Sequence, residues 1–152
     1  AFARFGVIGR GAAMAHAQAL VKRFDVRGTE GGGLDTVTRG LSGGNMQKLI
    51  LGRALAGDPH HAGPPVLIVA NQPTWGLDIG AVAYVHQQLL DACAQGSAVL
   101  LISEDLDEVF ALADRIAVMH HGRLGAPKPA REWTLAAIGL AMAGGGEATH
   151  AA

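Results

Sequence analysis

The chain has 152 residues, 49% of them hydrophobic, which is long enough for one domain with a substantial core. Twelve basic and thirteen acidic side chains leave a net charge of −1, so composition gives no sign of a nucleic-acid partner. The lone Cys93 cannot form an internal disulfide, which fits a reducing cytosol, and no apolar run reaches membrane-spanning length.

The first part of the chain predicts two helices joined by a loop. Good helix formers and an apolar face at helical spacing predict a helix from Arg10 to Phe24. Residues 25–40 are rich in glycine and threonine and predict a loop. A second helix follows, with Ser42 in the N-cap position, and it is expected to end near Gly57.

The rest of the chain alternates between short apolar runs and helical patterns, which predicts a parallel sheet of the α/β class. The continuous apolar runs are typical of strands that are covered on both faces. The predicted elements are strands over 66–70, 98–102 and 116–119, helices over 79–94, 106–113 and 133–143, and a hairpin turn over 120–123. The paired histidines at 60–61 and 120–121 lack the spacing of metal ligands and are assigned to solvated turns.

Residues 41–48, Leu-Ser-Gly-Gly-Asn-Met-Gln-Lys, place a serine and two glycines at the start of the second helix. Free N–H groups and the helix dipole make such a turn an anion-binding feature, although taken alone it is most often only a cap. The octet resembles the signature motif of ABC-type ATPases, in the form found in ATP-binding subunits of bacterial sugar and nucleoside importers, with Asn45 where glutamine is usual. The resemblance covers about residues 1–124. It implies a P-loop NTPase fold whose parallel sheet is flanked by helices.

The turn after the first predicted strand resembles the acidic strand end of the same family. Asn71 and Gln72 stand where ABC ATPases have an aspartate that supports Mg²⁺ and a glutamate that polarises the attacking water. Amides are neutral, so they are poor magnesium partners and poor general bases. Glu104 stands where a histidine usually contacts the γ-phosphate, and a carboxylate there repels phosphates, although it could also cap the helix that begins near Leu106. The resemblance therefore implies no intact catalytic residue and no metal site in this domain.

What remains is half of an ATP site. In the family, ATP and Mg²⁺ lie between the phosphate loop of one nucleotide-binding domain and the signature of another. The resemblance implies that six residues serve ATP and Mg²⁺ held mainly by the partner domain: Ser42, Gly43, Gly44, Asn45 and Gln47 in the signature, and Asp78 in the D-loop, which would align the two domains.

The sequence contains no GxxxxGK[S/T] phosphate loop. We expect a C-terminal piece of the second, degenerate domain of a tandem importer ATPase. There are two alternatives: the two strands that border the phosphate-loop strand in the family pair directly with each other here, or the chain is a pseudogene-like remnant. The expected segments are a helical subdomain with the signature over 1–57, an α/β core over 58–126, and a terminal helix and flexible tail over 127–152. Alone, such a chain is expected to be inactive.

The resemblance also implies partners and a location. The expected partners are another nucleotide-binding domain, in the same polypeptide or in a dimer, and transmembrane permease subunits. The expected location is cytoplasmic, peripheral to the inner face of the plasma membrane. Two other functions stay open: a non-catalytic module that pairs with ABC domains, and a soluble ABC protein of DNA repair or translation.

Overall fold

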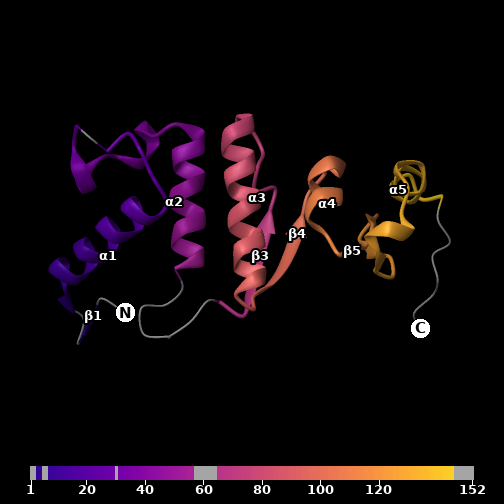
Figure 1. The fold of residues 1–152 in the computed structure, drawn as a ribbon, viewed down its shortest axis with the longest axis horizontal. Helices are drawn as coiled ribbons and strands as arrows, with labels where there is room; N and C mark the ends of the chain where they lie inside the picture. Colours follow the sequence, from indigo (N-terminus) through magenta and orange to yellow (C-terminus); the bar gives the residue numbers. More distant parts are fainter. Residues whose placement is uncertain (1–2, 5–6, 30, 57–64, 146–152) are drawn as a thin grey trace. The chain divides into compact units, whose positions relative to one another are not determined.

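The computed structural model describes residues 3–4, 7–29, 31–56 and 65–145, which belong to two compact units, Ala1–Ile102 and Ser103–Ala152 (Figure 1). Within the described residues, no helix has both the length and the apolar character needed to cross a bilayer. The predicted helix end near Gly57, the histidines at 60–61 and the tail beyond Gly145 lie outside the described residues.

The first unit begins with a largely helical region. Its elements are the antiparallel strands β1 (Ala3–Arg4) and β2 (Val7–Ile8), the helices α1 (Arg10–Arg23) and α2 (Gly43–Leu55), and the 3₁₀ turns η1 (Gly33–Asp35) and η2 (Thr38–Gly40). Phe24, directly after α1, is only 1% exposed and forms a buried cluster with Leu20 and Val26. The two predicted helices and the loop between them are thus confirmed, and the loop contains two 3₁₀ turns.

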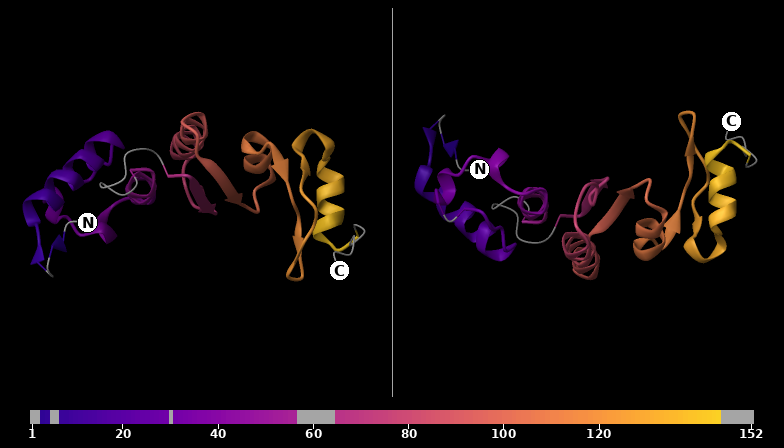
Figure 2. Two further views of the ribbon diagram at one scale, coloured as in Figure 1. Left: turned by 90° about the horizontal axis from the view of Figure 1, so that it is seen from below. Right: turned by 90° about the horizontal axis from the view of Figure 1, so that it is seen from above.

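The first unit continues with a strand–helix–strand motif. Strands β3 (Leu67–Asn71) and β4 (Ala98–Ile102) pair in parallel, with Leu67 opposite Ala98, and helix α3 (Ile79–Ala94) connects them and lies beside the sheet (Figures 1 and 2). This is the α/β arrangement that the alternating pattern predicts. Among the described residues, β4 has β3 as its one paired neighbour.

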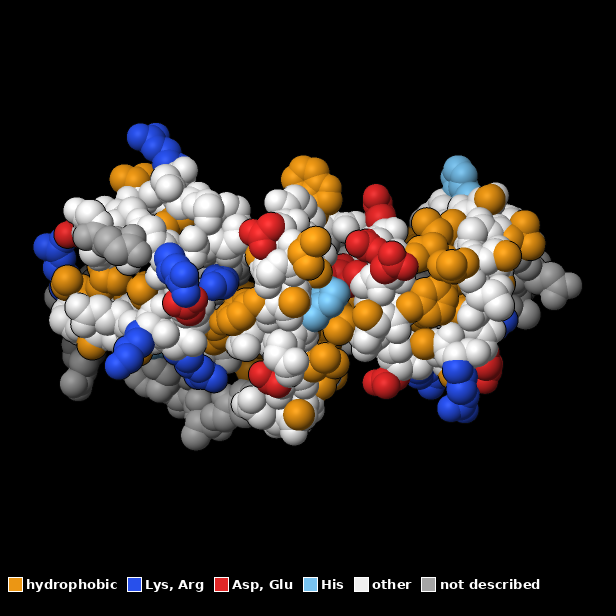
Figure 3. Space-filling model, turned by 45° about the horizontal axis from the view of Figure 1, so that its top comes forward, with side chains coloured by type: hydrophobic (Ala, Val, Ile, Leu, Met, Phe, Trp, Pro, Cys, Tyr) orange, Lys and Arg blue, Asp and Glu red, His pale blue; other side chains and the backbone are white. Residues whose placement is uncertain are grey.

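The prediction that these strands are covered on both faces is wrong for this chain. Ile68 and Ala70 are buried, but Leu67 and Val69, which alternate with them, are 57% and 59% exposed. Successive side chains of a strand point to opposite faces, and only one face is covered. Figure 3 shows one face of the molecule, on which hydrophobic side chains reach the surface in several places.

The second unit corrects the predicted third parallel strand. Residues 116–119 do not form one strand. Ile116 ends β5 (Arg115–Ile116), which pairs antiparallel with β8 (Lys128–Pro129), and Met119 begins β6 (Met119–His120), which pairs antiparallel with β7 (Arg123–Leu124); residues 117–118 lie between the two strands. A short apolar run does not specify its pairing partner, and the chain that follows provides two antiparallel ones.

The turn and the last helix of the second unit agree with the sequence. His121 and Gly122 join β6 to β7 with φ of 45° and 74°, the positive values that a tight hairpin turn requires. Helix α5 (Leu135–Met142) follows a 3₁₀ turn, η3 (Ala130–Glu132), and begins after the N-cap Thr134. Trp133 donates from Nε1 to the carbonyl oxygen of Ile116 at 3.1 Å, which ties the start of this helix to β5.

Gly52 is predicted to be irreplaceable in the packing of α2. A Cβ at this position lies 2.6 Å from Cδ2 of the buried Phe24, so Gly52→Ala forces that ring to shift. We expect the free energy of unfolding to fall by about 1–3 kcal/mol, measured by urea denaturation. Gly11→Ala is the matched control, because its Cβ meets nothing within 4 Å on the exposed side of α1 and should stabilise the helix. Equal stability of the two variants would contradict the packing described here.

Candidate functional site

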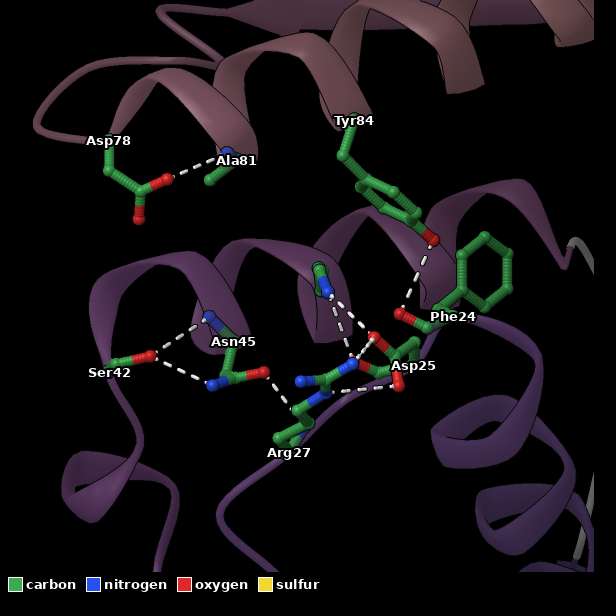
Figure 4. A network of polar contacts seen from close by, with 9 residues as sticks. Phe24, Asp25, Arg27, Ser42, Asn45, Asp78, Ala81 and Tyr84 are labelled. Carbon is green, nitrogen blue, oxygen red and sulfur yellow. Dashed lines mark hydrogen bonds and ion pairs between the residues drawn. The ribbon is translucent and has the colours of Figure 1, made fainter.

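Ser42 caps the helix that carries the signature motif. Its backbone is extended, with φ −62° and ψ 157°, and α2 begins at the next residue. Its Oγ accepts from the backbone N–H of Asn45 at 3.4 Å and from Nδ2 of the same residue at 2.8 Å (Figure 4). The predicted N-cap is therefore confirmed. Ser42 and Gly43 are exposed, and helix geometry leaves the first N–H groups of α2 without intrahelical acceptors.

The two signature glycines differ in their surroundings. A Cβ on Gly43 would lie 3.9 Å from the carbonyl oxygen of Gly76 and 4.0 Å from Cδ2 of Leu77, which is ordinary van der Waals contact. A Cβ on Gly44 lies 3.3 Å from Cβ of Ala81 and 3.9 Å from Oδ2 of Asp78, both at the start of α3. Gly44 thus allows the first turns of α2 and α3 to approach closely, while Gly43 is exposed.

Asp78 holds the start of α3 in place. Its Oδ1 accepts from the backbone N–H of Ala81 at 2.9 Å, the bond of an N-cap (Figure 4). The side chains that flank it along the chain are strongly exposed: Trp75 at 84% and Ile79 at 90%. The D-loop segment therefore presents a fixed carboxylate between two apolar side chains.

Gln47 connects the signature helix to the turn after β3. Its Nε2 donates to the carbonyl oxygen of Pro73 at 2.6 Å. Pro73 is buried and follows Asn71 and Gln72, the two amides at the family's acidic positions. This bond joins residues 26 positions apart in the sequence, and it holds α2 in place against the end of β3.

Asn71 and Gln72 lie at the carboxyl end of the sheet. Asn71 is the last residue of β3 and is exposed, opposite Ile102. Gln72 has φ +47°, which is uncommon for a residue with a Cβ, and its N–H donates to the carbonyl oxygen of Ile102 at 2.8 Å. Carboxyl ends of parallel strands are where α/β sheets bind ligands, and here both side chains are neutral.

Glu104 belongs to the second unit, and the possible role as a helix cap is wrong. Helix α4 (Leu106–Leu112) is capped by Asp105, whose side chain accepts from the N–H groups of Asp107 at 2.9 Å and Glu108 at 3.2 Å. The N-cap is the residue directly before the helix, and Glu104 is one position too early.

A cluster of charged side chains joins the loop after α1 to α2 and α3, and it was missed by the sequence analysis. Nζ of Lys48 lies 3.1 Å from the carbonyl oxygen and 3.3 Å from Oδ2 of Asp25, and 4.9 Å from the ring centre of Tyr84. Arg27 pairs with the same carboxylate at 3.1 Å, and Tyr84 donates to the carbonyl oxygen of Phe24 at 3.3 Å (Figure 4). The only signal in the sequence was Lys48 itself, at the end of the signature octet.

These contacts shift two pKa values. The hydrogen bond from Arg27, and next that from Lys48, lowers the pKa of Asp25 below its usual 3.8. Burial, followed by the charge of Asp25, raises the pKa of Tyr84 above its usual 10.0. Asp25 is therefore ionised and Tyr84 is neutral near pH 7, as their hydrogen bonds require.

The lowered pKa of Asp25 predicts a pH-dependent contribution to stability. A carboxyl with a depressed folded pKa stabilises the fold above its unfolded pKa of 3.8, and this contribution is lost as the pH falls through the folded pKa. Asn tolerates the positive φ of 47° at this position, so Asp25→Asn removes the charge while keeping the backbone. We expect a lower thermal midpoint for the variant at neutral pH, and convergence with the parent well below pH 3.8. A difference that persists unchanged in acid would exclude the ion-pair explanation.

The fold and the signature turn together define the class. Residues of this chain superpose on the ATP-binding cassettes of ABC transporters. A nucleotide-free cassette, 27% identical, matches with a TM-score of 0.60 over 77% of this chain and 43% of its own length. A dimeric cassette bound to ADP and Pi, 23% identical, matches with a TM-score of 0.63 over 84% of this chain and 51% of its own length. The predicted ABC-type ATPase fold is confirmed.

Sequence relatives define the branch. The glucose import ATP-binding protein TsgD13 of Haloferax volcanii is 44% identical over 98% of this chain, and the guanosine import ATP-binding protein NupO of Bacillus subtilis is 41% identical over 94%. This chain is thus a homologue of the ATP-binding proteins of sugar and nucleoside importers. It spans about a quarter of the length of these relatives, 26% in both cases. No family model matches the chain.

Proposed function

We propose that this chain is part of the ATP-binding component of an ABC importer for sugars or nucleosides, and that it supplies the signature half of an ATP site. The names of its relatives, which include import proteins for glucose and guanosine, support the solute class. The observation that carries the proposal is the exposed Ser42 turn, whose hydroxyl and free N–H groups lie at the start of a 13-residue helix.

The chemistry of this turn suits a phosphate. The positive end of α2 and the N–H donors of its first turn favour an anion, and Gly43, which is exposed and has no side chain, lets phosphate oxygens approach the backbone. Such donors act by stabilising charge on the transferring phosphoryl group, which is an electrostatic and positioning role. The ATP itself would be held mainly by the phosphate loop of a partner nucleotide-binding domain.

The residues of this chain do not suit Mg²⁺ or a general base. Asn71 and Gln72 offer neutral amides where the family has carboxylates, and the described residues contain no group of three or more His, Cys, Asp or Glu that could hold a metal. Magnesium and the catalytic carboxylate are therefore assigned to the partner domain. In this proposal the chain's own site is degenerate, and its contribution to hydrolysis is made in trans.

The partners follow from the same assignment. Trp75 and Ile79 expose apolar surface on both sides of the capped Asp78, which suits burial against a second nucleotide-binding domain. Because the relatives are importers, permease subunits are the proposed membrane partners, and the proposed location is the cytoplasmic face of the membrane.

The test uses a chimaera in which this chain replaces the matched segment of NupO. Ser42→Arg places a bulky cation where the signature would meet the γ-phosphate, so ATP turnover should fall at least about a hundredfold, measured by phosphate release. Ala94→Arg is the control, because this exposed residue ends α3 at the end remote from Asp78 and should leave turnover unchanged. An Arg at position 42 that leaves turnover intact would rule out a role of this chain in trans.

A further inference from the structure

The side-chain amide of Asn45 is held at both ends. Its Oδ1 accepts from the backbone N–H of Arg27 at 2.7 Å, and its Nδ2 donates to Oγ of Ser42 at 2.8 Å (Figure 4). A backbone N–H can only donate, so the amide atom that faces Arg27 must be the oxygen. The NH₂ group therefore faces Ser42, and the orientation of the amide is fixed by chemistry.

The same reasoning fixes the hydroxyl of Ser42. The NH₂ group of Asn45 has no acceptor capacity, so Oγ of Ser42 must accept its hydrogen bond. The backbone N–H of Asn45 approaches the same oxygen at 3.4 Å. Since both lone pairs of Oγ face Asn45, the O–H bond points away from it, and Ser42 is an exposed residue.

The backbone N–H of Arg27, which donates to Asn45, is itself held in place by the fold. Arg27 follows Val26, which is 5% exposed and whose N–H donates to the carbonyl oxygen of Val21 at 3.0 Å. The guanidinium of Arg27 pairs with Asp25, which in turn holds Lys48 of α2. The loop after α1 is thus held to α2 at Asn45 and again at Lys48, and its N–H at Arg27 determines which way the amide points.

We propose that Asn45 is a positioning residue that orients the Ser42 hydroxyl as a hydrogen-bond donor toward a phosphate oxygen of ATP. This role requires that Ser42 contacts a phosphate, as the proposed function holds. Phosphate oxygens only accept at neutral pH, so a hydroxyl already turned outward as a donor needs no reorganisation when charge develops on the transferring group. In this role Asn45 acts through the hydroxyl of Ser42, with its Oδ1 and one of its two Nδ2 hydrogens engaged within the chain.

Asn45→Asp tests this role in the same chimaera. The new carboxylate still accepts from Arg27, but its second oxygen accepts from Ser42 and turns the hydroxyl hydrogen inward. We expect kcat for ATP hydrolysis to fall about tenfold to a hundredfold, with KM changed less than about twofold.

A double-mutant cycle separates positioning from simple charge repulsion. If Asn45 acts through the hydroxyl, Asn45→Asp should change kcat less than about twofold once Ser42→Ala has removed it. An equal loss with and without the hydroxyl, or no loss in the single variant, would overturn the positioning role. If Ser42→Arg left turnover intact, the proposed function would fail, whereas a damaging Ser42→Arg with a harmless Ser42→Ala or Asn45→Asp would overturn only the role of Asn45.

A measurement on the unmodified 152-residue chain tests the geometry without any variant. A long-range HNCO spectrum should show a scalar coupling between the amide nitrogen of Arg27 and the side-chain carbonyl carbon of Asn45, across the 2.7 Å hydrogen bond. A coupling from Arg27 to a different carbonyl carbon would overturn the assignment of the amide orientation.

Discussion

The geometry of the first unit depends on a glycine, which has no side chain, at position 44. Helices α2 and α3 begin side by side because Gly44 allows its backbone to approach Ala81, where an added Cβ lies at only 3.3 Å. The cap at Asp78 and the bond from Gln47 to Pro73 then fix the two helices and the end of β3 relative to one another. The signature turn, the D-loop and the amide pair at Asn71 and Gln72 are therefore parts of one rigid arrangement.

This arrangement gives the turn at Asn71 and Gln72 a structural role. The side chains of Asn71 and Gln72 are neutral amides. The carbonyl oxygen of Pro73, which follows them, accepts from Gln47, and the N–H of Gln72 continues the pairing with β4. The left-handed conformation at Gln72 costs free energy, of the order of 1 kcal/mol, which these contacts offset. Under the proposed function, the turn holds the signature helix in place although its own side chains take no part in ATP hydrolysis.

Local pattern was enough to predict most of the elements. The helix over 79–94 and the strand over 98–102 have the predicted bounds, because apolar periodicity and short-range capping decide them. The N-cap at Ser42 was predictable for the same reason. The resemblance to ABC-type ATPases predicted the fold class, because the signature octet and the motifs after the predicted strands follow one another at the spacing seen in that family.

Contacts between distant segments could not be predicted. The one-sided burial of β3 depends on what covers the sheet, and the division of residues 116–119 depends on later strands. Asn45 was predicted as a nucleotide ligand from its motif, and that role stays a prediction. The hydrogen bonds of its amide with Arg27 and Ser42 could not be predicted, because Arg27 lies 18 residues away. The cluster of Asp25, Lys48 and Tyr84 likewise joins three segments whose sequences carry no shared pattern.

The most direct test is a structure of the chimaeric ATP-binding protein with a non-hydrolysable ATP analogue and Mg²⁺. The proposed function predicts that Oγ of Ser42 lies about 2.7 Å from an oxygen of the γ-phosphate, with the triphosphate held by the other nucleotide-binding domain. A structure in which this turn lies beyond hydrogen-bonding distance of every bound nucleotide would contradict it.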